Sequence, residues 1–422
     1  MTSRGEGRWL RAFRLSLRSI GPELIAGASD NDPTNVATAT VVGAQTGYAL
    51  SWIGLLVAPL LAVVLAIAAQ VGMTARSDLQ TLARRRYGRG VAAVLLASVV
   101  TVNLVTIAAD LQAGSAGIGL LVGVDPRWLV LPLGAGLAAL LLIGRYGQVV
   151  KLLRYVLPGF LVFTAAAILA RPDWPRLLAA SLRPDLSLSG GDLVGALALL
   201  GTTLTSYVYI WETVQRGVDE PASHDSGHGR RGLVRARAGA VSGALFTAVI
   251  LWSMLVASAA TLGRHHEAVT SAQDAARALR PLAGPLAGDL FAVGLVVSAV
   301  VALPVLIAST AHVVGAQFDW RRGLGQPIGR ARRFYAVLAA ATGLAVVVSL
   351  LGVPVIRMLV VASVIGGLGT PLGLVILVRL ARDPEAMAGQ PISPALAIAG
   401  WAVAIAVAAL GVLLIVTVLG GL

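Results

Sequence analysis

Apolar runs of about 20 residues, the length at which a helix crosses a bilayer, recur along the whole chain and are separated by short polar stretches. Run length and flanking charge predict eleven membrane spans. Their approximate ranges are 21–46, 49–73, 91–122, 128–144, 152–170, 192–215, 236–262, 284–317, 333–351, 356–378 and 394–420. The longest polar stretches, near 171–191 and 216–235, are predicted to be loops. The pattern predicts an all-α polytopic membrane protein without a soluble domain.

Two of the predicted spans are interrupted by polar residues. The first span breaks at 32–35 (DPTN), and the sixth breaks at 201–206 (GTTLTS). Because the breaks lie five spans apart, they predict two five-span repeats that are inverted relative to each other, with unwound backbone offering carbonyls to a cation. The predicted parts are a cytoplasmic basic tail at 1–20 and a single transmembrane transport domain at 21–422. That domain contains two repeats, at about 21–170 and 192–378, and an extra span at about 394–420.

Composition supports a membrane protein and narrows its chemistry. Hydrophobic residues make up 57% of 422 positions, and the mean hydropathy is +0.83. The chain has no cysteine, so a bound metal would have oxygen, nitrogen or thioether ligands. The net charge of +13 comes from basic residues in short loops between apolar runs, which is typical of membrane topology and does not predict a nucleic-acid partner.

The basic residues also predict an orientation in the plasma membrane. If the N-terminus is cytoplasmic, 25 of the 33 basic residues lie on the cytoplasmic side and 8 lie outside, as positive-inside topology requires. An odd number of spans then places the C-terminus outside. The first 20 residues contain five arginines but no apolar run followed by a cleavage site, so they are expected to form a retained cytoplasmic tail.

Asp32 lies near the middle of the first span, where a carboxylate costs roughly 2.5 to 3.5 kcal/mol on insertion scales. Pro33 has no N–H group and disfavours helical geometry at Asp32, so the chain is expected to unwind and to turn the Asn35 amide oxygen toward the same point. A carboxylate, an amide oxygen and freed backbone carbonyls suit a hard divalent cation. The alternative is an ordinary turn in which Asp32 caps the following helix.

The stretch from Gly21 to Gly88, which includes GASDNDPTN and SDLQTLARRRYG, resembles the opening of the Nramp divalent-metal transporters. That family carries an Asp-Pro-Gly-Asn motif in its first span, and the glycine is Thr34 here. The resemblance implies a LeuT-like fold with an ion site between the two broken spans. By position, the implied ligands are Asp32, Asn35, the backbone carbonyls of Ser29 and Thr202, and Thr205, with Ser206 and Tyr207 completing the place of a Met-Pro-His motif.

The family's methionine ligand is replaced by Thr205, which leaves a site made only of oxygen. Without the thioether, the site lacks a ligand that soft transition metals prefer. We therefore expect Mg²⁺ to be favoured, with Mn²⁺ or Fe²⁺ second. Nramp-related magnesium transporters show this kind of methionine loss. Mg²⁺ keeps part of its water shell, so Asp30, Thr203 and Ser206 are candidates for contacts to that water. Alternatively, Thr205 is a small packing residue between helices.

The resemblance also implies a proton route through acidic residues of span three and a histidine of span six. Those positions are Asn103, Ala113 and Tyr207 here. Asparagine and alanine do not titrate, and tyrosine ionises only far above neutral pH. We therefore expect uptake driven by the membrane potential without protons. Asp110 is the acid that remains: it could form a substitute relay with Glu212, or it could hydrogen-bond to neighbouring polar groups.

Other potential metal ligands are placed outside the site. The sequence HHE at 265–267 has no third ligand at fixed spacing, which is typical of a solvated loop. His224 and His228 are four residues apart, but the proline and glycine around them disfavour a helix. His312 is expected to pack within the eighth span.

The leading hypothesis is a transporter of divalent cations, whose partners are the ion and the lipid bilayer and which needs no resident cofactor. A proton-coupled Mn²⁺ or Fe²⁺ transporter is the alternative. A sodium-coupled transporter of an organic solute on the same architecture is less favoured, because Asp30 and Asp32 would repel a carboxylate. No enzyme is expected, since the sequence contains no HExxH, GxSxG or phosphate-binding loop. The sequence predicts no oligomeric state.

Overall fold

The computed structural model describes residues 29–143, 157–184, 190–219, 230–264, 269–277 and 284–420. These residues form helices joined by short connections, and none of them belongs to a strand. The predicted basic tail, the 265–267 sequence, His224 and His228 lie outside the described residues.

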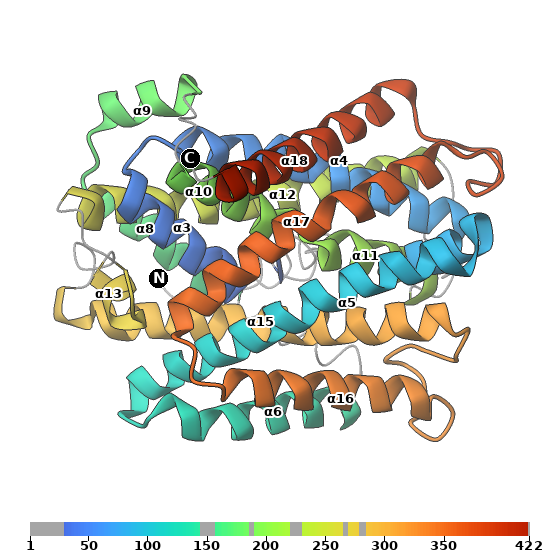
Figure 1. Ribbon diagram of the computed structural model, residues 1–422, viewed down its shortest axis with the longest axis horizontal. Coiled ribbons are helices and arrows are strands. Elements are labelled where there is room, and N and C mark those ends of the chain that lie inside the picture. The colour runs from blue at the N-terminus through green and yellow to red at the C-terminus, as the bar shows by residue number, and fades with distance from the viewer. Residues whose placement is uncertain are drawn as a thin grey trace, which may run out of the picture.

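The helices follow the chain in an order that can be traced by colour in Figure 1. Their bounds are α3 Pro33–Thr46, α4 Ser51–Ala75, α5 Leu79–Val122, α6 Pro126–Ile143, η1 Leu157–Phe160, α8 Leu161–Leu169, α9 Trp174–Leu182, α10 Gly190–Thr203, α11 Ser206–Val214, η2 Gln215–Asp219, α12 Arg230–Thr261, η3 Leu262–Arg264, α13 Ala272–Ala276, η5 Gly284–Leu286, α15 Ala287–Gln317, α16 Arg332–Ser349, α17 Val355–Arg382 and α18 Pro394–Gly420.

Helix is present within every predicted span, and the expected all-α polytopic class is confirmed. Eight helices of the described part are long and apolar enough to cross a membrane, counting α10 with α11 as one, and a shorter apolar helix covers Pro126–Leu142. The helix pair α10 and α11 is the innermost of these, because 94% of its apolar window is buried, against 33% for α18. Polar groups on α10 and α11 are therefore shielded from lipid.

Helix α5 begins twelve residues before the predicted start of the third span. The Asp78 carboxylate caps it by accepting the Thr81 N–H at 2.8 Å. Gly88 has φ 84° and ψ 173°, a backbone conformation that favours glycine, and it bends the helix between its polar first turns and its apolar span. Run length located the apolar span but not the polar extension.

The prediction that 171–191 is a loop is wrong for Trp174–Leu182, which form helix α9. Its start is fixed by Asp173, whose carboxylate accepts the Arg176 N–H at 3.2 Å, and Leu177 on one face is fully buried. A helix this short shows too few apolar positions to stand out from a polar stretch. The second predicted loop, 216–235, is also helical where it overlaps η2 and the start of α12.

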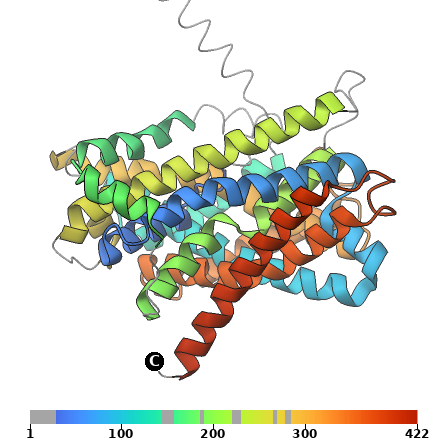
Figure 2. The same cartoon turned by 90° about the horizontal axis from the view of Figure 1, so that it is seen from above.

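The packing places α3 and the break between α10 and α11 at the centre of the molecule. Helix α3 packs against α12, α10, α17 and α5, while α5 runs along α15. Helices α6 and α16 lie together at one edge (Figure 1), and Figure 2 shows the C-terminal part of α18 extending away from the other helices. Interrupted backbone is thus surrounded by intact helices, where other protein groups can satisfy it.

One end of the helix bundle is tied by buried polar contacts. The Asp78 carboxylate accepts a hydrogen bond from the Arg322 guanidinium at 2.6 Å, and Arg322 also donates to the Thr81 hydroxyl at 2.7 Å. The Leu79 N–H donates to the Thr213 hydroxyl at 3.1 Å. These contacts join the start of α5 to the end of α11 and to the connection between α15 and α16.

A candidate ion site between two broken helices

The first break lies immediately before α3. Ser29 is helical and Asp30 to Asp32 are not, and Pro33 opens the next helix. Asp32 has an extended backbone, with φ −69° and ψ 166°, and its Oδ1 accepts the Asn35 N–H at 2.6 Å. Asp32 therefore caps α3, as the alternative interpretation holds, and it does so while fully buried. The capping hydrogen bond uses Oδ1 of Asp32, and the other carboxylate oxygen, Oδ2, takes no part in it.

Asn35 folds back over this break. Its Nδ2 donates to the Asp30 backbone carbonyl at 2.9 Å, which fixes the rotation of the amide, and its Oδ1 has no hydrogen-bond partner in the described structure. Asp30, Asp32 and Asn35 are 0%, 0% and 1% exposed. A buried amide oxygen without a partner is costly, so it is a natural position for a cation ligand.

The second break separates α10 from α11 at Leu204 and Thr205. The Thr205 hydroxyl donates to the Thr202 carbonyl at 2.9 Å, so two of the expected ligands touch each other. The Leu204 carbonyl, which the break releases from the helix, accepts the Thr370 hydroxyl from α17 at 3.1 Å. Thr203 donates to the Leu199 carbonyl at 2.7 Å, which directs it along its own helix.

Sequence reasoning missed the contribution of α17 to this break. Besides the Thr370 hydroxyl, α17 brings the backbone atoms of Ser363 and Gly367 close to Gly201. A Cβ atom added at Gly201 would overlap these backbone atoms. The signal was present in the sequence as the glycines and threonine of VIGGLGT, near the middle of the tenth span. Small residues at such positions let helix backbones approach closely in membranes.

Tyr207, in the first turn of α11, connects the two breaks. Its hydroxyl lies 2.8 Å from the Ser29 carbonyl oxygen and 3.3 Å from Asp32 Oδ2, and it donates toward both. The Tyr207 side chain is fully buried. One hydroxyl group, which belongs to the helix after the second break, therefore contacts two expected ligands of the first break, Ser29 and Asp32.

Further oxygen atoms around the breaks are buried and lack hydrogen-bond partners among the residues that the structure describes. They include both carboxylate oxygens of Asp30, the amide oxygen of Asn31 and the hydroxyls of Thr202 and Ser206. No three Asp, Glu, His or Cys side chains of the described chain are grouped so as to hold a metal together. A cation here would therefore depend on amide, hydroxyl and backbone oxygens besides Asp32.

Asp110 is bonded to the first break rather than to a relay partner. Its Oδ1 accepts the Thr34 hydroxyl at 2.6 Å and the Thr34 N–H at 3.1 Å. Hydrogen bonding of Asp110 to neighbouring polar groups is thus present, and its partner, Thr34, is the residue that replaces the motif glycine. This contact joins α3 to α5.

The remaining expected residues bond elsewhere. Asn103 donates to the hydroxyls of Ser309 and Thr310 on α15, at 3.3 and 3.0 Å. Glu212 forms an ion pair with Arg216 at 3.1 Å, one turn along the same segment. His312 is buried as expected, edge-on to the rings of Phe334 and Trp211.

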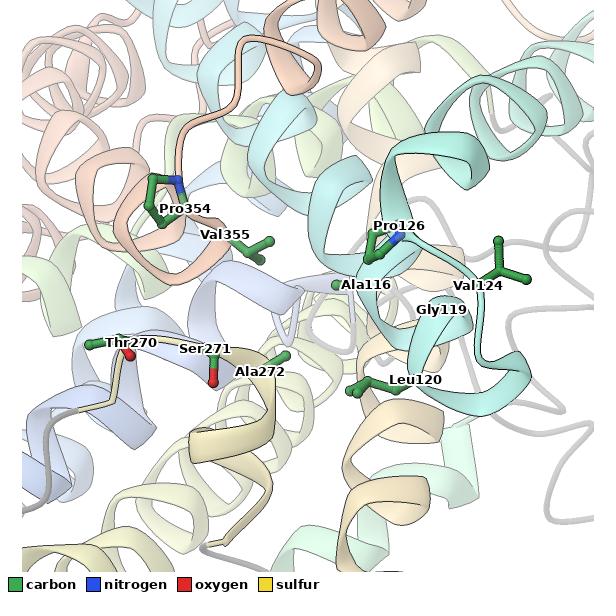
Figure 3. A pocket seen from close by; sticks show the side chains of 10 residues that line it. All are labelled: Ala116, Gly119, Leu120, Val124, Pro126, Thr270, Ser271, Ala272, Pro354 and Val355. Atoms are coloured by element: carbon green, nitrogen blue, oxygen red, sulfur yellow. The ribbon is translucent and has the colours of Figure 1, made fainter.

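A separate pocket of about 330 Å³ lies near the C-terminal end of α5 and the start of α17. Figure 3 shows Thr270 and Ser271, before and at the start of α13, facing Pro354 and Val355 across it, with Leu120 on the α5 side. Its lining is mainly apolar and includes none of the expected ligands, so it is not the candidate ion site.

Comparison with known proteins gives a family match over almost the whole chain. Residues 23–417 match the family described as Nramp, natural resistance-associated macrophage protein-like. The chain is 28% identical to the divalent metal cation transporter MntH of Deinococcus radiodurans, over 97% of this chain and 92% of that protein.

Solved structures show the same fold. The Eremococcus coleocola manganese transporter, as its H236A mutant, matches with a TM-score of 0.73 and 18% identity, over 97% of this chain and 89% of that one. MhsT in complex with L-phenylalanine matches with a TM-score of 0.57 and 15% identity, over 95% and 98% of the two chains. The expected LeuT-like fold with interrupted first and sixth spans is confirmed.

Proposed function

Because this chain belongs to the Nramp family, we propose that it carries a divalent metal cation across a membrane and that the ion binds between the two broken helices. The observation that carries the proposal is the junction of the breaks. The Asp32 carboxylate, the unpartnered Asn35 amide oxygen and the Ser29 carbonyl belong to one break, and Tyr207 links it to the other. Oxygen ligands of this kind suit hard divalent cations.

We propose Mn²⁺ as the principal substrate and Mg²⁺ as a second candidate. The Deinococcus radiodurans relative is named a divalent metal cation transporter and the Eremococcus coleocola protein a manganese transporter, which favours Mn²⁺ over the Mg²⁺-first expectation from sequence. Mg²⁺ stays a candidate because Thr205 leaves oxygen where a thioether would select softer ions. The proposed ligands are Asp32, Asn35, Ser29, Thr202 and Thr205.

Transport without protons remains our prediction for this chain, against the proton-coupled alternative. Asn103 and Ala113 offer no titrating group, and Glu212 is engaged by Arg216. A dication gains about 4.6 kcal/mol from 100 mV, at about 2.3 kcal/mol per charge, which is enough to drive uptake. We further propose the five-plus-five repeat with an extra span, and an N-terminus inside the cell.

Purified protein in liposomes provides the test. With an inside-negative potential, vesicles should accumulate Mn²⁺ above protein-free vesicles, and a competition series of Mg²⁺, Ca²⁺ and Cd²⁺ should rank the other ions. The signal of a pH-sensitive dye trapped inside the vesicles should stay constant during uptake, because no protons enter with the ion. Acidification would contradict the uncoupled mechanism, and the absence of flux for every divalent ion would contradict the proposed function.

Thr205→Met is expected to shift ion preference toward Cd²⁺. A thioether placed at the break offers a soft ligand and removes a hard one, so the ratio of Cd²⁺ to Mn²⁺ uptake should rise by roughly tenfold, a change of about 1.4 kcal/mol. Thr205→Val, which keeps the shape without the hydroxyl, is the control. An unchanged ratio in Thr205→Met would mean that Thr205 is a packing residue.

A further inference from the structure

We propose that the Tyr207 hydroxyl competes with the transported cation for the Ser29 carbonyl oxygen and Asp32 Oδ2. The proposal deepens the function proposed above and rests on it. In this proposal Tyr207 is a competing hydrogen-bond donor. Its hydroxyl lowers the affinity for the ion and must be displaced when the ion binds.

The geometry leaves the hydroxyl little choice of partner. Tyr207 carries one hydroxyl proton, which faces the Ser29 carbonyl at 2.8 Å and Asp32 Oδ2 at 3.3 Å, so the two acceptors share it. The other Asp32 oxygen, Oδ1, is already held by the Asn35 N–H at 2.6 Å. Oδ2 is therefore the Asp32 oxygen that can turn to an ion, and it is the one that Tyr207 contacts.

A proton donor and a cation cannot use the same lone pair at once. The partly positive hydroxyl hydrogen satisfies a buried carboxylate, and a hydrogen bond to an ionised group is about twice as strong as one between neutral groups. A dication bound to the Ser29 carbonyl and Oδ2 would repel that hydrogen and break both contacts. The free energy of ion binding therefore includes the cost of displacing the Tyr207 hydroxyl.

Displacement would also change how the two breaks are joined. Tyr207 lies in the first turn of α11, whereas Ser29 and Asp32 belong to the break before α3. On ion binding, the hydroxyl link between these two segments is exchanged for ligation of the ion by Asp32 on one segment and by Thr202 and Thr205 on the other. Ion occupancy would in this way be coupled to the relative position of two elements that must move during transport.

The rival role for Tyr207 is that of a ligand, and it predicts the opposite sign. Adjacent oxygens of an octahedral Mg²⁺ site lie about 3 Å apart for metal–oxygen bonds of about 2.1 Å. The separations of 2.8 and 3.3 Å are compatible with that spacing as well as with hydrogen bonds. Competition predicts that removing the hydroxyl tightens ion binding, whereas ligation predicts that it weakens binding.

The test is equilibrium binding of Mn²⁺ to the purified full-length protein by calorimetry, with thermal melting as a check on folding. Tyr207→Phe should bind Mn²⁺ about tenfold more tightly than the wild type. Tyr209→Phe is the matched control, because Tyr209 is a buried tyrosine on the same helix whose hydroxyl contacts the Thr370 carbonyl at 3.5 Å. Its affinity should stay within about twofold of the wild type.

The outcomes separate this proposal from the proposed function. Equal or weaker binding by Tyr207→Phe, beside normal binding by the wild type and Tyr209→Phe, overturns the competition and leaves the transporter standing. Absence of Mn²⁺ binding in the folded wild type overturns both. If Tyr207→Phe fails to melt cooperatively, Tyr207→Leu replaces it, and it must also bind more tightly for the competition to hold.

Discussion

Replacing Asp32 by alanine is expected to lower the initial rate of Mn²⁺ uptake by roughly 100-fold or more. Asp32 is fully buried and is the charged group among the proposed ligands, and its Oδ2 lies at the junction of the two breaks. Removing one partner of a buried charged pair costs about 3 kcal/mol or more, and 1.4 kcal/mol corresponds to a tenfold change. The measurement is uptake into proteoliposomes at a fixed membrane potential.

The control is Asp289→Ala, which removes an exposed carboxylate from the first turn of α15, a helix that contains neither break. Its uptake should match the wild type. Transport by Asp32→Ala at more than a tenth of the wild-type rate would mean that the ion crosses without this carboxylate.

Replacing Gly201 by valine is expected to abolish transport and to lower the melting temperature by about 5 °C or more. A side chain at Gly201 would overlap the Ser363 carbonyl and the Gly367 backbone, and backbone atoms inside packed helices cannot move aside at low cost. The displaced segment would carry Thr202 and Thr205 away from the first break. Thermal melting in detergent and uptake in liposomes measure the two effects.

Gly136→Val tests whether this effect is specific to the crossing of α10 and α17. Gly136 also lies in an apolar helix, but a Cβ atom there meets nothing within 4 Å. It should melt and transport like the wild type. A stable and active Gly201→Val protein would contradict the close approach of α17 to the second break.

The spans and both breaks were predictable because they depend on local sequence. A run of apolar residues long enough to cross a bilayer has few alternatives, and a proline after a mid-membrane carboxylate interrupts a helix wherever it occurs. Helix α9 and the polar start of α5 were missed because each depends on a capping carboxylate, Asp173 or Asp78, within a stretch that has weak periodicity.

Contacts between distant segments were not predictable from the residues alone. The bond from Thr34 to Asp110 spans 76 positions, and the bond from Tyr207 to Ser29 spans 178. The sequence shows that the glycine, the acidic residues and the histidine of the family pattern are replaced, but only the fold shows that two of the replacements, Thr34 and Tyr207, form hydrogen bonds at the first break. The replaced residues thus change the surroundings of the proposed site rather than only removing functions from it.

The central claim is that the transported ion binds where the two broken helices meet. Anomalous X-ray diffraction from crystals soaked in Mn²⁺, recorded on both sides of the manganese absorption edge, tests this most directly. We predict one strong anomalous peak in contact with Asp32 and Asn35, close to the Ser29 carbonyl and to Thr205. A peak elsewhere in the membrane-spanning region, with none at Asp32 in protein that transports Mn²⁺, would contradict the account.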